Sequence, residues 1–192
     1  MKFLLILVLY IFSPIGISDQ IPTPDIDQSL TGGNFHLHSS QGDFFLDQLK
    51  GQVVLLYFGY TRCPDICPTS LSIIAQALNE LSQEELKSVQ GVFVSVDPKR
   101  DSYQALDEYV RYFHPNLMAV TGSEEEVAQV ARQYGAQYKA VPLEGSGLGY
   151  AVDHSAVIYL ITPEGDLRFT FPHGTPAFVI LEAIRYALTN GK

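Results

Sequence analysis

Short runs of apolar residues recur along the chain and predict the strands of one sheet. Residues 53–58 form an unbroken apolar run, residues 91–97 are mostly apolar, and residues 156–161 form a third run. Runs of this length without alternation are typical of strands that are buried on both faces. Residues 117–120 predict a shorter strand of the same kind.

The segments between these runs predict helices, because their apolar residues recur at intervals of three and four. The first helix is expected over residues 68–81, and the second from Asp101, as its capping residue, to about residue 113. Serine followed by glutamate three residues later, the spacing of a capping box, predicts helices after Ser82 and Ser123. Pro176 favours the first position of a terminal helix.

Two hairpins complete the predicted architecture. Residues 34–46 alternate around a polar turn, and a tight turn at 162–166 joins the run 156–161 to an antiparallel partner at 167–171. Strands that alternate with helices favour a parallel sheet with helices on both faces. We therefore predict an α/β fold, a thioredoxin-like three-layer sandwich. Its mostly parallel central sheet carries an antiparallel edge hairpin and an N-terminal β-hairpin.

The N-terminus predicts export. Residues 3–12 are all apolar after Met1-Lys2, and small residues follow, as in a secretory signal peptide. Because the run is shorter than the ~20 residues that span a bilayer, residues 1–18 are expected to be cleaved. An uncleaved membrane anchor through residues 3–17 is the alternative. Residues 19–33 predict a linker, which leaves residues 34–192 as one folded domain.

The charge of the chain argues against nucleic acid as a partner. The formal net charge is −9 at pH 7, and loss of residues 1–18 would leave 11 basic against 21 acidic residues. Phosphate backbones favour clustered Lys and Arg, so an acidic domain suits a cation or a small basic protein better.

The only two cysteines, Cys63 and Cys67, lie between the run 53–58 and the predicted helix, and a proline follows each. Pro68 favours the first helical position, so Cys67 is expected to be the N-cap. Both sulfurs would then lie near backbone N–H groups of the helix start, which favour the thiolate form.

Three roles are open to this pair. A structural disulfide would stabilise little, because so short a loop removes little entropy from the unfolded chain. The carboxyl edge of an α/β sheet is instead where such folds present ligands. The pair is therefore interpreted as a redox-active disulfide, Cys63–Cys67, or as two ligands of a soft metal.

A third candidate ligand is His154, which directly precedes the run 156–161. In a thioredoxin-like sheet the loop that enters this strand passes close to the helix with the dithiol. Two thiolates and one imidazole suit Cu(I), and with a further oxygen ligand Cu(II), whereas structural zinc takes four protein ligands. The predicted metal ligands are therefore Cys63, Cys67 and His154, with Asp153 as a residue that could orient the imidazole.

The remaining candidates are weaker. His36 and His38 share one face of a predicted strand and could bind a metal weakly, but a solvated hairpin face is favoured. His114 and His173 are interpreted as loop residues at element ends. Asp97 ends its strand at the same sheet edge as the thiols. Its carboxylate could alter the properties of the metal site as a neighbour of the ligands. We favour the alternative, in which the carboxylate holds the following loop by hydrogen bonds to nearby backbone N–H groups, as in an Asx turn.

Several motifs together resemble the Sco/SenC family of copper chaperones of cytochrome oxidase assembly. They span roughly residues 34–189 in order and comprise Phe58-Gly-Tyr-Thr-Arg-Cys-Pro-Asp-Ile-Cys-Pro-Thr69, Ser95-Val-Asp-Pro-Lys-Arg-Asp101, Tyr112-Phe-His-Pro115, Asp153-His-Ser155 and Ile161-Thr-Pro-Glu-Gly165.

The resemblance implies a thioredoxin-like fold and copper bound by Cys63, Cys67 and His154. It also implies delivery to the binuclear copper centre of oxidase subunit II, with other copper carriers as further partners. The domain would lie in the periplasm or on the outer face of the cytoplasmic membrane. Arg62 departs from the family pattern, because many relatives carry histidine at this position. The arginine places a cation beside the site.

Two classes of function follow. The first is a metallochaperone, which is not an enzyme. The alternative is a thiol–disulfide oxidoreductase that acts on cysteines of an exported oxidase subunit, with Cys63 as the attacking thiolate and Cys67 as the resolving thiol. His154 distinguishes the two classes, because a reductase can do without it.

Overall fold

The computed structural model describes residues 32–143, 145, 147 and 149–190. The predicted signal peptide or anchor and most of the predicted linker lie outside these residues. In the described part of the chain, no helix is both long and apolar enough to cross a membrane. The elements in chain order are β1 (His36–Ser39), β2 (Gly42–Phe45), η1 (Leu46–Leu49), β3 (Val53–Gly59), α1 (Ile66–Asn79), α2 (Gln83–Leu86), β4 (Val89–Ser95), α3 (Tyr103–Phe113), β5 (Leu117–Val120), α4 (Glu124–Gln133), β6 (Tyr138–Pro142), β7 (Tyr150–His154), β8 (Val157–Ile161), β9 (Leu167–Pro172) and α5 (Ala177–Asn190).

The central sheet has five strands in the order β5-β4-β3-β8-β9. β3 pairs in parallel with β4, and β4 pairs in parallel with β5, whereas β8 runs antiparallel to both β3 and β9. Every residue of β3 is buried, as its unbroken apolar run requires. The predicted α/β sandwich is confirmed, with the β8–β9 hairpin as the antiparallel edge of the sheet.

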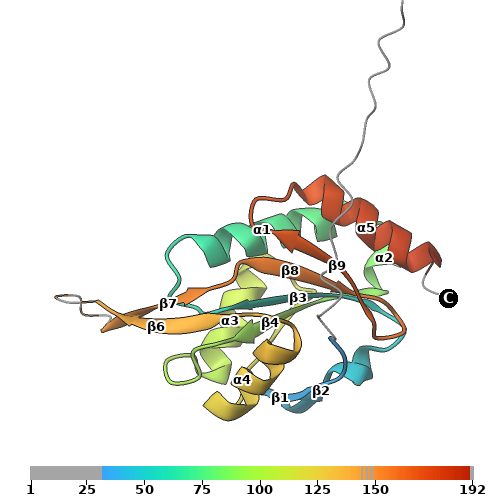
Figure 1. Ribbon diagram of the computed structural model, residues 1–192. Coiled ribbons are helices and arrows are strands. Elements are labelled where there is room, and N and C mark those ends of the chain that lie inside the picture. The colour runs from blue at the N-terminus through green and yellow to red at the C-terminus, as the bar shows by residue number, and fades with distance from the viewer. Residues whose placement is uncertain (1–31, 144, 146, 148, 191–192) are drawn as a thin grey trace, which may run out of the picture.

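Helices cover both faces of this sheet. Figure 1 shows α1 and α5 together above it and α4 below it. α1 contacts both α5 and α3. The contact with α3 agrees with the right-handed crossovers β3–α1–β4 and β4–α3–β5, which place their two helices on the same face. The helix that starts from the dithiol is therefore packed on several sides.

The N-terminal hairpin β1–β2 lies next to β5 and α4. The backbone groups of His38 and Thr121 exchange hydrogen bonds of 2.8 and 2.9 Å, which attach β1 at the end of β5. The last two residues of the predicted linker are also held, because Gln133 donates to the carbonyl of Gly32 and Tyr134 to that of Gly33. The predicted hairpin is thus confirmed and docked.

The short 3-10 helix η1 and the two strands β6 and β7 were not predicted. β6 and β7 pair antiparallel as a separate two-stranded hairpin, where the sequence indicates a glycine-containing loop. Figure 1 shows this hairpin as an arm that projects beyond the central sheet. His154 consequently lies at the end of a strand and not in the loop in which it was expected.

Two predicted helix caps are wrong and two are confirmed. α1 begins with Asp65 as its N-cap, so that Cys67 lies in the first turn. Pro68 is tolerated there because the first backbone N–H groups of a helix have no intrahelical partner in any case. α3 is capped by Ser102 and not by Asp101. The capping boxes of α2 and α4 are both present, with Ser82 and Ser123 as caps.

Candidate metal and redox site

The dithiol lies where β3 ends and α1 begins. Cys67 is fully buried, Cys63 is half-buried, and both thiols are free. The backbone N–H of Cys67 donates to the sulfur of Cys63 over 3.4 Å. The prediction that both sulfurs lie at the helix N-terminus therefore holds for Cys63, whereas the sulfur of Cys67 is packed beneath the helix against the sheet.

Glycine at the end of β3 allows this packing. A Cβ atom at Gly59 would lie 2.8 Å from the sulfur of Cys67 and 2.8 Å from the ring of Phe93, which is closer than carbon atoms approach in folded proteins. Only a residue without a side chain leaves room for the buried sulfur at this point.

His154 reaches this sulfur from the unpredicted hairpin. Its Nε2 lies 3.2 Å from the sulfur of Cys67, although 87 residues separate the two in sequence. The ligand atoms of Cys63, Cys67 and His154 all lie within 4.8 Å of one another. The structure thus brings together the three residues that the sequence singles out.

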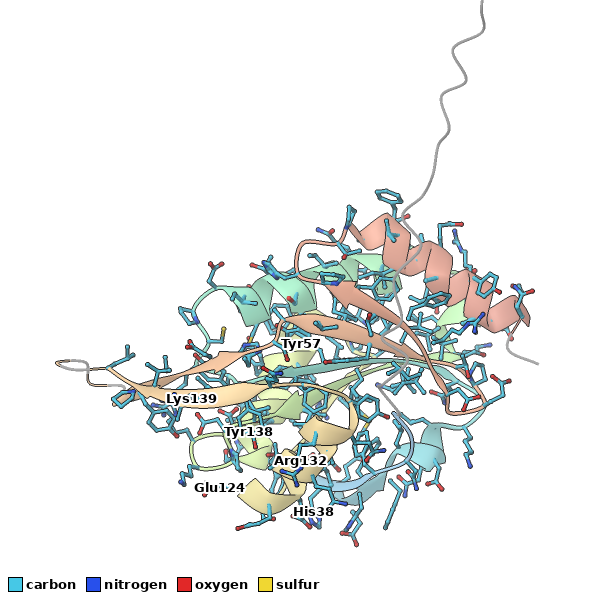
Figure 2. The ribbon with its side chains drawn as sticks, viewed as in Figure 1. His38, Tyr57, Glu124, Arg132, Tyr138 and Lys139 are labelled. Carbon is cyan, nitrogen blue, oxygen red and sulfur yellow. The ribbon has the colours of Figure 1, made fainter. Side chains whose placement is uncertain are left out.

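Aromatic rings and a carbonyl surround the imidazole of His154. The rings of Tyr57 and Tyr60 meet it edge-on, with centroids 6.1 and 5.9 Å away. Its Nδ1 faces the carbonyl of Ser155 at 3.3 Å. Figure 2 shows Tyr57 near the centre of the molecule, where its side chain is fully buried. The imidazole is therefore oriented by packing as well as by polar contact.

The two thiols have different proton affinities. The pKa of Cys63 is lowered, chiefly because its sulfur accepts a hydrogen bond from the Cys67 thiol. Contact with His154 and backbone N–H groups of Asp65 and Cys67 lower it further, against the opposing effect of burial. The pKa of Cys67 is raised, because its thiol donates to Cys63 and because it is buried. Cys63 is therefore the thiolate of the pair.

Asp101 fixes the loop that carries Cys63. Its buried carboxylate accepts from the backbone N–H and hydroxyl of Thr61, over 3.0 and 2.5 Å, and from the hydroxyl of Ser95 over 2.6 Å. A side chain predicted to cap a helix instead ties the dithiol loop to the end of β4.

Asp97 holds the strand that carries His154. Its carboxylate pairs with the guanidinium of Arg100 and accepts a 2.6 Å hydrogen bond from the hydroxyl of Tyr150. Arg100 in turn donates to the carbonyl of Tyr150 over 2.7 Å, and its guanidinium carbon lies 3.6 Å from the centre of that ring. We call these three residues the Asp97 clamp. The segment 95–101 thus positions both the thiols and the imidazole.

The other predicted residues lie elsewhere or play other parts. Asp153 is exposed on β7, so its effect on the imidazole stays a prediction. His114 is buried at the end of α3, where its Nδ1 accepts from the backbone of Asn116 and burial lowers its pKa. His173 follows β9 and contacts Ser70. Arg100 and Tyr150 were not singled out by the sequence, because only the fold brings Tyr150 next to the loop after β4.

The fold and the site together define a class, the thioredoxin-like proteins in which a dithiol before a helix faces a histidine from a neighbouring strand. Within that class the assignment is specific. The family model SCO1/SenC matches residues 23–189, and the chain belongs to this family.

Relatives with similar sequences agree with this family assignment. The chain is 39% identical to the human mitochondrial SCO2 homologue over 177 residues, which cover 88% of this chain and 64% of that protein. It is 42% identical to the bovine SCO2 homologue over 156 residues, which cover 76% and 58%. The chain thus spans about three-fifths of the length of these mitochondrial relatives.

Copper-bound structures from two organisms superpose closely. Arabidopsis thaliana ScoI with copper bound has a TM-score of 0.75 at 38% identity, with 82% of this chain and 98% of that one covered. Yeast Sco1 with copper bound has a TM-score of 0.74 at 34% identity, with 83% and 88% covered. BsSco, described as a member of the Sco family of cytochrome c oxidase assembly proteins with a disulfide switch, has a TM-score of 0.65 at 26% identity, with 86% and 98% covered.

Proposed function

We propose that this protein is a metallochaperone that binds copper and assists the assembly of cytochrome c oxidase. The observation that carries the proposal is the convergence of Cys63, Cys67 and His154, whose ligand atoms lie within 4.8 Å of one another. The copper-bound Arabidopsis and yeast structures support it, as does the oxidase-assembly role stated for the family of BsSco.

The donor set suits transfer of copper as cargo. Soft thiolates favour Cu(I) and the imidazole adds a third ligand, while one sulfur remains half-exposed. A groove lies directly beside that sulfur, lined by Tyr60, Cys63, Pro64, Asp65, Ile66 and residues 151–154. A recipient that enters this groove could supply its own ligands while Cys67 still holds the ion.

The recipient that we propose is the binuclear copper centre of oxidase subunit II, with other copper carriers as donors. We also propose that the domain is exported, in the periplasm or at the outer face of the cytoplasmic membrane. A bacterial relative from Bacillus anthracis is described as a lipoprotein of this family, which supports a place at a membrane. No cysteine occurs in residues 1–18 of this chain, so we propose attachment through the mostly apolar residues 3–17 and not through a lipid on a cysteine.

Copper analysis of the reduced protein tests the proposal. We expect one copper ion per chain, and His154→Ala should lower the affinity for Cu(I) at least ~10-fold, since even residues behind a metal ligand change affinity by about 10–100-fold. His173→Ala is the matched control, because that histidine is exposed and lies outside the cluster. Unchanged, stoichiometric binding by His154→Ala would exclude the three-ligand site.

The Asp97 clamp allows a second, subtler test. Tyr150→Phe removes the hydroxyl that donates to Asp97 but keeps the ring beneath Arg100. Because a hydrogen bond contributes about 0.5–1.5 kcal/mol, we expect Cu(I) affinity to fall by up to ~10-fold. The imidazole resonances of His154 should also broaden or shift, because its strand is less firmly held. Exposed Tyr112 offers the control Tyr112→Phe. Equal effects of both substitutions would argue against positioning by the clamp.

A specific observation also favours a second candidate, a thiol–disulfide oxidoreductase. Cys63 is half-exposed with a lowered pKa, and Cys67 is buried beside it. The Cys63 thiolate would attack a substrate disulfide, forming a mixed disulfide and releasing one substrate thiolate. Cys67, after losing its proton, would then attack Cys63, releasing the second thiolate and leaving the Cys63–Cys67 disulfide. Reduction of a model disulfide that survives His154→Ala, in a protein that binds no copper, would favour this function.

A further inference from the structure

A second cluster of ligating side chains lies at the N-terminal hairpin. His36 and His38 are on β1, Asp43 is on β2, and Glu126 is in the first turn of α4. The ligand atoms of His36, His38 and Glu126 lie within 4.8 Å of one another. Figure 2 shows His38 at the lower edge of the molecule with Glu124, well apart from Tyr57 at the thiol site. This hairpin cluster therefore belongs to a different surface.

The two imidazoles face one carboxylate oxygen. Oδ1 of Asp43 lies 3.1 Å from Nε2 of His36 and 3.0 Å from Nδ1 of His38. Because Asp43 faces Nδ1 of His38, the other ring nitrogen of that residue, Nε2, is left on the side of Glu126. The ligand atoms of His36, His38 and Glu126 can therefore share one ion after small adjustments of these side chains, which are 32–40% exposed.

Several contacts hold these side chains in place. The ring of His36 stacks on Phe45, with centroids 4.4 Å apart, and lies 4.8 Å from the ring of His38. The backbone N–H and carbonyl of His38 both form hydrogen bonds with the backbone of Thr121. Glu126 uses Oε2 in its capping box, which leaves Oε1 directed at His38, 3.8 Å from Nε2. The cluster is thus partly preorganised by strand pairing and by a helix cap.

We propose that His36, His38 and Glu126 form a second metal site for a divalent transition-metal ion, with Asp43 at Nδ1 of His38 as the residue that orients its ring. Imidazole with carboxylate suits Zn(II) and Cu(II), and Cu(II) forms the stronger complexes of the two. Mg(II) and Ca(II) prefer sites made entirely of oxygen. The site contains no sulfur, so its occupancy does not depend on the redox state of the thiols. The chain would retain a place for Cu(II) when Cys63 and Cys67 are oxidised.

The test uses the full chain without a histidine tag, in which Cys63, Cys67 and His154 are all replaced by alanine. Titration with Cu(II), and separately with Zn(II), is followed by calorimetry, and the Cu(II) form by electron paramagnetic resonance. We expect one ion of either metal per chain, nitrogen hyperfine structure for Cu(II), and no binding of Mg(II). His38→Gln should lower the affinity at least ~10-fold, since even residues behind a ligand matter by about that factor. His173→Gln should leave it unchanged.

Absence of a stoichiometric Cu(II) or Zn(II) site in this variant would overturn the proposal, as would equal affinities of the His38→Gln and His173→Gln variants. If the triple variant does not fold, Zn(II) titration of the wild-type chain with its thiols joined in a disulfide answers the same question. There the resonances of His36 and His38 should shift in step with one equivalent of metal. Loss of copper binding at the thiol site leaves these outcomes untouched, so the two proposals fail separately.

Discussion

Replacing Cys67 with serine should abolish stoichiometric Cu(I) binding. The substitution exchanges a soft thiolate for a hydroxyl, which Cu(I) does not favour, at the buried sulfur that lies 3.2 Å from Nε2 of His154. We expect the affinity to fall by more than ~100-fold, beyond the range of about 10–100-fold that residues behind a ligand produce. Competition with a chromogenic Cu(I) chelator measures it.

The control for this prediction is a test of whether the Cys67→Ser protein still folds without copper. Serine is close to cysteine in shape, and its hydroxyl can still bond to His154, so the folded structure should persist with cooperative thermal unfolding. Cys63→Ser should cause a comparable loss of affinity. Retention of one tightly bound copper ion by a folded Cys67→Ser protein would show that the buried sulfur is not a ligand.

Gly59→Ala should be the most damaging single-methyl change near the site. The added Cβ would lie 2.8 Å from the sulfur of Cys67 and from the ring of Phe93, both of which are fully buried. Overpacking of this kind costs about 1–3 kcal/mol of unfolding free energy. Because the sulfur has to move, Cu(I) affinity should fall as well. Urea unfolding and chelator competition measure the two effects.

Gly147→Ala is the matched control, because a Cβ at that position meets nothing within 4 Å. Its effect on unfolding should stay within about 0.5 kcal/mol, as for most surface substitutions. Equal destabilisation by the two variants would mean that the chain shifts enough at Gly59 to accept a methyl group.

The sheet could be predicted from the sequence because its strands carry long apolar signals. Every residue of β3 is buried, and the pattern that announces such a strand does not depend on its partners. The capping boxes at Ser82 and Ser123 were equally local and equally reliable. Besides the single-turn helix η1, the β6–β7 hairpin escaped, because its first strand is mostly exposed and its connection contains three glycines. Without burial on one face, no periodicity marks such a strand.

The candidate metal ligands could be predicted from the sequence, but the residues that hold them in place could not. Cys63 and Cys67 are the only cysteines, and His154 follows from its place before β8. The roles of Asp97 and Asp101 were misjudged or left general, because their partners lie far away in sequence. Asp101 binds Thr61, 40 residues distant, and Asp97 binds Tyr150, 53 residues distant. Such pairings depend on which strands are neighbours, and no single-sequence pattern records that.

The 87-residue separation between Cys67 and His154 makes the complete ligand set a property of the folded chain alone. The unfolded chain keeps two thiols four residues apart but has no imidazole near them. An ion held by all three residues therefore stabilises the native state by mass action, by about 2.7 kcal/mol at a free ion concentration of 100 times Kd. Loading makes the protein harder to unfold, and delivery of the ion returns it to its less stable form. Thermal denaturation thus reports how much of a population still carries its cargo.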